Sequence, residues 1–296
     1  MVLCLFSSVV FAADGPGTTG ALYLRLPVGP KSIAMGEAGA AVEGDHFGWL
    51  TNPGLLADAE GTGIGLFHSQ WVLDTYYDNI TLTWRPAPMV SVGAGLTYMS
   101  TPEVQGFDVM GSETGMLKNN NFQGILGICV TPISNFGAGV SIKYFQERIA
   151  DWTASGIGFD AGAVFRLPLT GLSFGASLQN IGPSIKFISH EEELPMTVRV
   201  GGAYHKTLVP GVLGLALAAD MVMPKHCDAY PSIGTELRLR DTVCLRVGYC
   251  GENEREDNGL TAGGGIDIMG TLTMDYAWTP YGDLGNFHRV SVYFRR

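Results

Sequence analysis

The sequence predicts a transmembrane antiparallel β-barrel of about fourteen strands, and three observations support this all-β fold class. Only 16% of the 296 residues are charged, against about 25% in soluble domains, and an apolar outer wall in lipid accounts for the deficit. From Thr62 onward, segments of about nine to twelve residues alternate between apolar and small or polar side chains. Short turns alternate with longer links, as they do in outer-membrane barrels.

The alternation keeps a period of two over whole segments. Val90, Val92, Ala94, Leu96 and Tyr98 share one face, and the residues between them are small or polar. A strand with lipid outside and a lumen inside requires this arrangement, whereas a helix does not sustain it. The outward faces often end in an aromatic residue, which suits a girdle at the bilayer interface: Trp84, Tyr98, Tyr144, Tyr204, Tyr249, Tyr276 and Trp278.

The connections between segments fall into two length classes. Tight turns are expected at 86–88, 132–135, 168–171, 209–211, 240–242 and 269–271. Longer links are expected at 101–121, 147–156, 182–193, 223–230, 251–258 and 279–287. Counting the segments between them gives about fourteen strands, an even number as bacterial single-chain barrels require.

Residues 1–61 do not alternate, and we expect two units in them. Residues 1–12 form an apolar run ending in small residues and are interpreted as a signal peptide; it lacks the usual Lys or Arg start, as an N-terminally truncated signal would. Residues 13–61 are too apolar to hang free and too broken to form strands. They are expected to be a hatch with short helices in the lumen of the 62–296 barrel, where Asp45 caps a helix that Asn52-Pro53-Gly54 stops.

Several other classes of protein are excluded or disfavoured. No segment beyond the signal reaches the run of about 18 apolar residues that a membrane-spanning helix needs. The net charge of −10 and the absence of a basic block argue against nucleic-acid binding. Neither the histidines nor the cysteines have metal-ligand spacing, so no metal or cofactor is predicted. Asp160 and His190 are too dispersed for a catalytic group and Glu191-Glu192-Glu193 is interpreted as a solvated loop, so we expect no enzyme.

Three stretches together resemble the PorV/PorQ-like family, which is itself similar to FadL-type outer-membrane transporters. The first combines Thr18-Thr19-Gly20-Ala21, Met35-Gly36-Glu37-Ala38-Gly39-Ala40 and Asn52-Pro53-Gly54-Leu55. The second is Phe67-His68-Ser69-Gln70-Trp71, and the third is Tyr276-Ala277-Trp278-Thr279-Pro280-Tyr281. The resemblance implies a FadL-like barrel of fourteen strands with an N-terminal hatch in the outer membrane of a diderm bacterium.

Three groups of residues are candidates for function. The hatch candidates for ligand contact are Met35, Phe47, Trp49, Asn52 and Pro53, and His68 with Trp71 is a candidate gate. Charged residues on the inward faces form either a polar conduit or a salt-bridge network that pins the hatch to the wall. We favour the network because buried charges need partners. These residues are Lys143, Asp160, Arg166, Arg199, Asp220, Glu236, Arg238, Arg246, Asp267, Asp275 and Arg289.

Two functions from different classes follow from the resemblance. As a FadL-like transporter, the barrel would pass a hydrophobic small molecule that is held near the hatch and released when the hatch moves. As a PorV-like scaffold or shuttle, it would bind secreted or surface proteins through its long loops, of which 102–121 is rich in apolar residues. Outer-membrane lipid is an expected partner in both cases.

Overall fold

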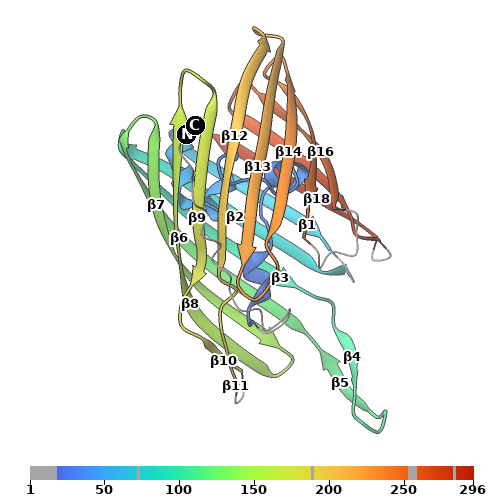
Figure 1. Ribbon diagram of the computed structural model, residues 1–296. Helices are drawn as coiled ribbons and strands as arrows, with labels where there is room; N and C mark the ends of the chain where they lie inside the picture. Colours follow the sequence, from blue (N-terminus) through green and yellow to red (C-terminus); the bar gives the residue numbers. More distant parts are fainter. Residues whose placement is uncertain (1–18, 72–73, 188–189, 253–258, 283–284) are drawn as a thin grey trace.

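The computed structural model describes residues 19–71, 74–187, 190–252, 259–282 and 285–296, and fourteen of the strands in these residues form one closed antiparallel barrel (Figure 1). The expected fold class and strand number are confirmed. The barrel strands are β1 (Thr62–Gln70), β2 (Tyr76–Ala87), β3 (Val90–Ser100), β6 (Asn119–Ile133), β7 (Phe136–Ile149), β8 (Trp152–Leu167), β9 (Leu172–Ile181), β12 (Thr197–Val209), β13 (Leu213–Pro224), β14 (Tyr230–Leu239), β15 (Val243–Cys250), β16 (Leu260–Ile268), β17 (Leu272–Pro280) and β18 (Asn286–Arg295).

The first and last strands close the barrel. β1 pairs with β18 from Gly63↔Arg295 to Gln70↔His288. Closure satisfies backbone hydrogen bonds that an open sheet edge would leave exposed to lipid, where unpaired polar groups cost several kcal/mol each. Along β1 the burial alternates residue by residue, with Phe67 buried and Leu66 and His68 exposed, as a wall between lipid and lumen requires.

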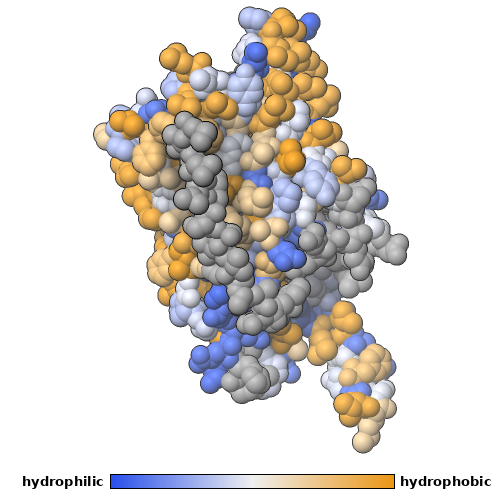
Figure 2. Space-filling view, viewed as in Figure 1, coloured by the Kyte–Doolittle hydropathy of each residue, from blue (hydrophilic) through white to orange (hydrophobic). Residues whose placement is uncertain are grey.

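The outer face of the wall is an apolar belt. Figure 2 shows hydrophobic side chains over the outer wall of β12–β14 at the upper right of the view. Tight turns such as those after Val209 and Leu239 gather at the end where β18 finishes, and the longer links lie at the other end. By the usual distribution of loops in such barrels, the tight turns are periplasmic and the long links extracellular.

Two of the long extracellular links contain paired strands of their own. The expected long link at 147–156 is wrong, because β7 and β8 run on and only residues 150–151 connect them. Within 101–121, β4 (Val104–Phe107) and β5 (Glu113–Leu117) pair as a hairpin that projects beyond the barrel (Figure 1). Within 182–193, β10 (Ile185–Phe187) pairs with β11 (His190–Glu192). The strands continue through 147–156 by backbone pairing, although the side chains there no longer alternate between apolar and polar.

Residues 19–61 form an N-terminal segment that lies inside the ring of strands (Figure 1). It contains η1 (Leu22–Arg25), α1 (Pro30–Ala34), η2 (Gly48–Leu50) and η3 (Pro53–Asp58). None of the helices in the described residues is long and apolar enough to cross a membrane. Helix η3 contacts β6, β7 and β8, while α1 contacts β15, β16 and β17, so the segment touches widely separated parts of the wall. The interpreted signal peptide and residues 13–18 lie outside the described residues.

A short helix, η2, ends at Leu50 just before Asn52, as expected, and the Asn52-Pro53-Gly54 stretch also begins a second helix, η3, which was not expected. The Asn52 side chain accepts a hydrogen bond from the Gly54 amide (3.0 Å), and Pro53 occupies the first helical position. Both are favoured at a helix N-terminus, because the cap satisfies a free amide and proline has no N–H to leave unpaired. Asp45 precedes η2 as expected and accepts from the Phe47 amide, but Phe47 and not Asp45 occupies the N-cap position of that helix.

Candidate functional site

An aromatic cluster lines the inner wall at the extracellular end of β1 and β18. Phe287 is buried, and its ring lies 5.8 Å from that of Trp71 in an edge-on arrangement and 4.5 Å from that of Tyr281. The Arg289 guanidinium lies 5.7 Å from the Phe287 ring on the next inward position of β18. This distance is within the range of a cation–π contact, which keeps the charge against an apolar surface.

A second aromatic group continues toward the periplasm on β1, β2 and the N-terminal segment. The Phe67 ring lies 6.0 Å from Tyr77 and 6.2 Å from Phe47, and all three side chains are buried. Leu26 and Leu50 of the N-terminal segment pack against the same cluster. We call Trp71, Tyr281, Phe287, Phe67, Tyr77 and Phe47 the aromatic ladder, because they extend from the extracellular end of the wall to the N-terminal segment.

The periplasmic side of the N-terminal segment is also packed against the wall. The His46 ring stacks on Tyr293 with centroids 3.8 Å apart, and the Tyr293 hydroxyl lies 2.6 Å from that of Thr83. Burial and the positive charges of Lys31, Arg295 and Arg238 lower the pKa of His46 to about 3, so its ring is neutral at physiological pH. Beside it, Glu43, His205 and Arg238 line a polar hollow of about 390 Å³.

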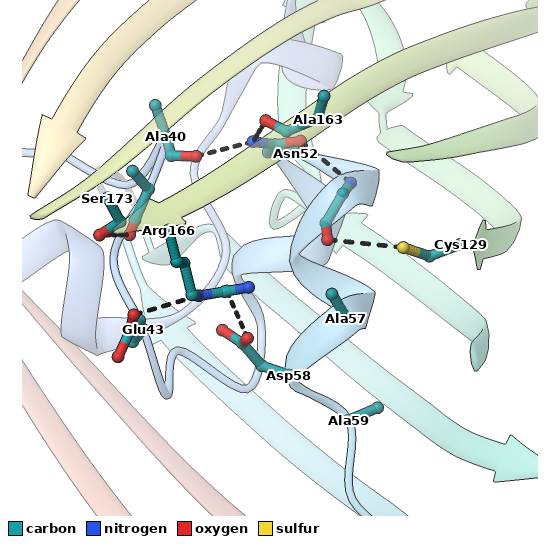
Figure 3. Close-up of polar contacts among 12 residues, drawn as sticks. Ala40, Glu43, Asn52, Ala57, Asp58, Ala59, Cys129, Ala163, Arg166 and Ser173 are labelled. Atoms are coloured by element: carbon teal, nitrogen blue, oxygen red, sulfur yellow. Dashed lines mark hydrogen bonds and ion pairs between the residues drawn. The ribbon is translucent and has the colours of Figure 1, made fainter. Parts of the chain in front are cut away.

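Asn52 ties two parts of the N-terminal segment to the wall (Figure 3). Its amide nitrogen donates to the carbonyl of Ala40 (2.7 Å) and to that of Ala163 on β8 (3.1 Å). The thiol of Cys129 on β6 donates to the carbonyl of Gly54 (3.6 Å). Asn52 is completely buried, so its loss would remove a buried hydrogen-bond donor from the carbonyl groups of Ala40 and Ala163.

Arg166, near the periplasmic end of β8, forms a second attachment (Figure 3). Its guanidinium pairs with Glu43 (3.1 Å) and with Asp58. Burial raises the pKa of Asp58 to about 6, although the charge of Arg166 opposes the shift. The ion pairs therefore join both sides of the η2–η3 region to one wall residue.

The remaining ion pairs show which luminal charges meet the N-terminal segment. Glu236 on β14 lies 2.6 Å from Arg246, 3.0 Å from Arg238 and 3.7 Å from Lys31 of α1. Asp220 accepts from the amides of Gly39 (2.8 Å) and Ala40 (2.9 Å) and pairs with Arg199. The Lys143–Asp160 pair (2.9 Å), the Arg246–Asp275 pair and the Asp267–Gly270 contact (2.6 Å) are within the wall.

The candidate ligand-contact residues of the N-terminal segment are buried against the wall, whereas the two candidate gate residues lie on opposite faces of it. Met35 is buried against β14 and β15, where a Cβ at Gly234 or Gly248 would overlap its backbone. Trp49 is buried and donates from its indole to Thr81 (3.0 Å), and Pro53 lies against Gly139. His68 faces outward, 2.6 Å from Asp78, and is half exposed, so it does not line the lumen. Trp71 is on the luminal side, where its ring contacts that of the inward-facing Phe287.

Sequence reasoning did not name Phe67, Phe287 and Tyr281 as candidate ligand contacts. A signal was present, because most inward positions of the wall are small or polar, and bulky apolar rings at Phe67 and Phe287 break that pattern. The inward charged residues were the stronger candidates from the sequence because a buried charge needs a partner.

The closed wall, the apolar outer belt and the filled lumen define an outer-membrane β-barrel, and its location is the outer membrane of a diderm bacterium. No protein-family model and no curated protein matches the sequence. Solved FadL-type transporters share the fold. The Pseudomonas putida toluene transporter TodX superposes with a TM-score of 0.61 at 13% identity, covering 96% of this chain and 97% of that one.

Two further structures are similar over nearly their whole length. The Ralstonia pickettii toluene transporter TbuX gives a TM-score of 0.61 at 14% identity over 90% of this chain and 96% of that chain. A Pseudomonas aeruginosa FadL homologue gives 0.54 at 10% identity over 91% and 98%. At these identities the likeness establishes the fold and leaves function to the site itself.

Proposed function

We propose that this barrel passes small hydrophobic molecules, aromatic hydrocarbons among them, across the outer membrane. The aromatic ladder is the observation that carries the proposal. Aromatic rings offer a large apolar surface and pair with one another in edge-on or offset geometries. A small aromatic solute can therefore replace one ring contact with another as it moves inward. The names of TodX and TbuX as toluene transporters support this substrate class.

In this proposal the N-terminal segment is a hatch that must move. Phe67, Tyr77 and Phe47 are almost fully buried, and Leu26 and Leu50 pack against them, so the ladder is covered in the state that the structure describes. Displacing the hatch exposes the lower rings and opens a way to the polar hollow beside Glu43 and His205. A hatch of this kind allows passage of a solute without a permanent aqueous channel.

The test compares two tryptophans of the same wall. Trp71 contacts Phe287 on the ladder, whereas Trp84 is half exposed on the lipid-facing side of β2. Uptake of a labelled monoaromatic hydrocarbon by cells displaying the protein should fall about two- to twelvefold in Trp71→Ala, since an aromatic pair contributes about 0.5–1.5 kcal/mol. Trp84→Ala, expressed to the same level, should keep wild-type uptake. Equal uptake in all three proteins would refute the ladder as the path.

A PorV-like scaffold for secreted or surface proteins is the alternative, and the β4–β5 hairpin favours it. Phe107, Val109 and Met110 are exposed near the tip of a hairpin whose strands form a two-stranded sheet separate from the barrel. Replacing residues 104–117 with a short Gly-Ser linker separates the two functions. The transporter retains hydrocarbon uptake after this change, whereas a scaffold loses a protein that co-purifies with the intact chain.

A further inference from the structure

A groove of about 580 Å³ lies in the outer face of the wall across β2, β3, β6, β7 and β8. Its sides include Ile80, Leu96, Leu126, Tyr144 and Ile157, which are all about half exposed. These are outward positions, so the groove opens toward lipid and is separate from the aromatic ladder inside. Nothing in the transport path uses this surface.

The groove exists because a large side chain is missing from one row of the wall. Leu96, Gly124, Tyr144 and Ile157 stand side by side on four neighbouring strands. Gly124 leaves a gap between Leu96 and Tyr144, and the next outward position of β3 toward the periplasm is only Ala94. A Cβ at Gly124 would have its nearest contact at 3.6 Å, with Leu96, so the backbone does not require glycine there.

A polar row lies above the groove on the same face. Ser100, Asn120, Arg148 and Thr153 are in register across β3, β6, β7 and β8. Arg148 lies four residues from Tyr144, which is about 13 Å along a strand. Its side chain is exposed, its Nε donates to the carbonyl of Ala150 (3.2 Å), and it has no acidic partner among the residues that the structure describes. Because β7 ends in an extracellular turn, this row is at the level of the outer-leaflet headgroups.

We propose that the groove and the polar row together bind one anionic lipid of the outer leaflet. An acyl chain fills the groove over Gly124, and the phosphate of the headgroup pairs with the Arg148 guanidinium. The depth of the groove within the lipid-facing belt argues for a hydrocarbon chain as its occupant, because no other apolar material is available at that depth. The guanidinium at the headgroup level adds the selectivity for negative charge, since it binds phosphate through two parallel hydrogen bonds.

The test uses native mass spectrometry of the full chain in mild detergent with equal amounts of phosphatidylglycerol and phosphatidylcholine. The wild-type protein should retain one phosphatidylglycerol more tightly than phosphatidylcholine. Gly124→Leu fills the groove and should lose this tightly held adduct for both lipids. Arg148→Gln should keep an adduct, but its preference for phosphatidylglycerol should fall to parity. Gly202→Leu, an outward glycine on β12 whose Cβ would lie 3.3 Å from the nearest atom, is the matched control and should resemble the wild type.

Heat-modifiable gel mobility verifies that each variant is a folded barrel. A folded Gly124→Leu protein that retains the adduct as tightly as the wild type would overturn the groove as the site. An unchanged preference in Arg148→Gln would overturn the role of the headgroup contact, and it decides the matter even where Gly124→Leu does not fold. Equal retention by all four proteins identifies only a general lipid shell and contradicts the proposal.

Discussion

At the scale of single residues, Asn52 joins two parts of the N-terminal segment, through Ala40 and Gly54, to Ala163 of the wall. Asn52→Ala removes two donated hydrogen bonds and one accepted bond. We expect a loss of about 2–4 kcal/mol in the stability of the segment, since each net hydrogen bond contributes about 0.5–1.5 kcal/mol and buried groups are left unpaired. Hydrogen–deuterium exchange over residues 40–58 measures the loss. Asn286→Ala, at an exposed position of β18, is the control and should leave this protection unchanged.

The raised pKa of Asp58 predicts how the attachment of η3 to Arg166 of the wall depends on pH. Its pKa is raised to about 6 where it is buried, whereas a solvated aspartate titrates near its ordinary value of 3.8. The buried state therefore binds the proton more strongly. The protonated Asp58 side chain contributes stability to the attached segment that grows as the pH falls from about 6 toward 3.8 and is lost as the pH rises through 6. Exchange over residues 53–61, corrected for intrinsic rates, should slow between pH 7.5 and pH 5 in the wild type. Asp58→Asn should abolish this dependence, and a wild-type rate that rises toward acid would contradict it.

Residue-scale prediction from the sequence had a clear limit. Alternation assigned Lys143, Asp160 and Glu236 to the inner face, where they lie, because the side-chain direction along a strand depends only on parity. It could not assign their partners. Lys31 reaches Glu236 only because α1 packs beside β15 and β17, and the path of a non-repeating segment is set by tertiary contacts.

At the scale of elements, α1 is joined to β14 and β15 through one buried carboxylate. Glu236→Ala would remove the ion-pair partner of Lys31 in an interior site, where loss of one partner costs about 3–5 kcal/mol, and would leave Arg246 with Asp275 alone. We expect a lower midpoint for the heat-induced gel shift and faster exchange over residues 29–36. Glu113→Ala on the exposed β5 hairpin should change neither quantity. Wild-type behaviour of Glu236→Ala would show that the pairing does not hold α1.

The strands were predicted better than the helices. The strand beginning at Thr62 and the tight turns follow from alternation and turn residues, which are local signals. The helix after Asn52 was missed because Asn-Pro-Gly is compatible with both a stop and a start, and only the buried partners of Asn52 select the start. The 147–156 region was missed because its side chains do not alternate, and only the backbone pairing of β7 with β8 extends the strands through it.

At the scale of the whole molecule, the barrel and its N-terminal segment have different roles. The wall alone satisfies the backbone and presents an apolar belt, which composition and periodicity could predict. The state of the lumen depends on whether residues 19–61 stay attached to β6, β8 and β14. In the proposed function, passage of a hydrophobic solute along the aromatic ladder therefore requires movement of this segment.

A reversible tether tests that requirement most directly. Ala57 of the segment and Cys129 of β6 both lie against Gly137, so Ala57→Cys places a second thiol beside a native one. Uptake of a labelled monoaromatic hydrocarbon is measured after oxidation, again after reduction, and in the Ala57→Cys/Cys129→Ser protein, which cannot form the tether. The account predicts that oxidation stops uptake, reduction restores it and the control is insensitive to both. Undiminished uptake by the fully oxidised protein would contradict it.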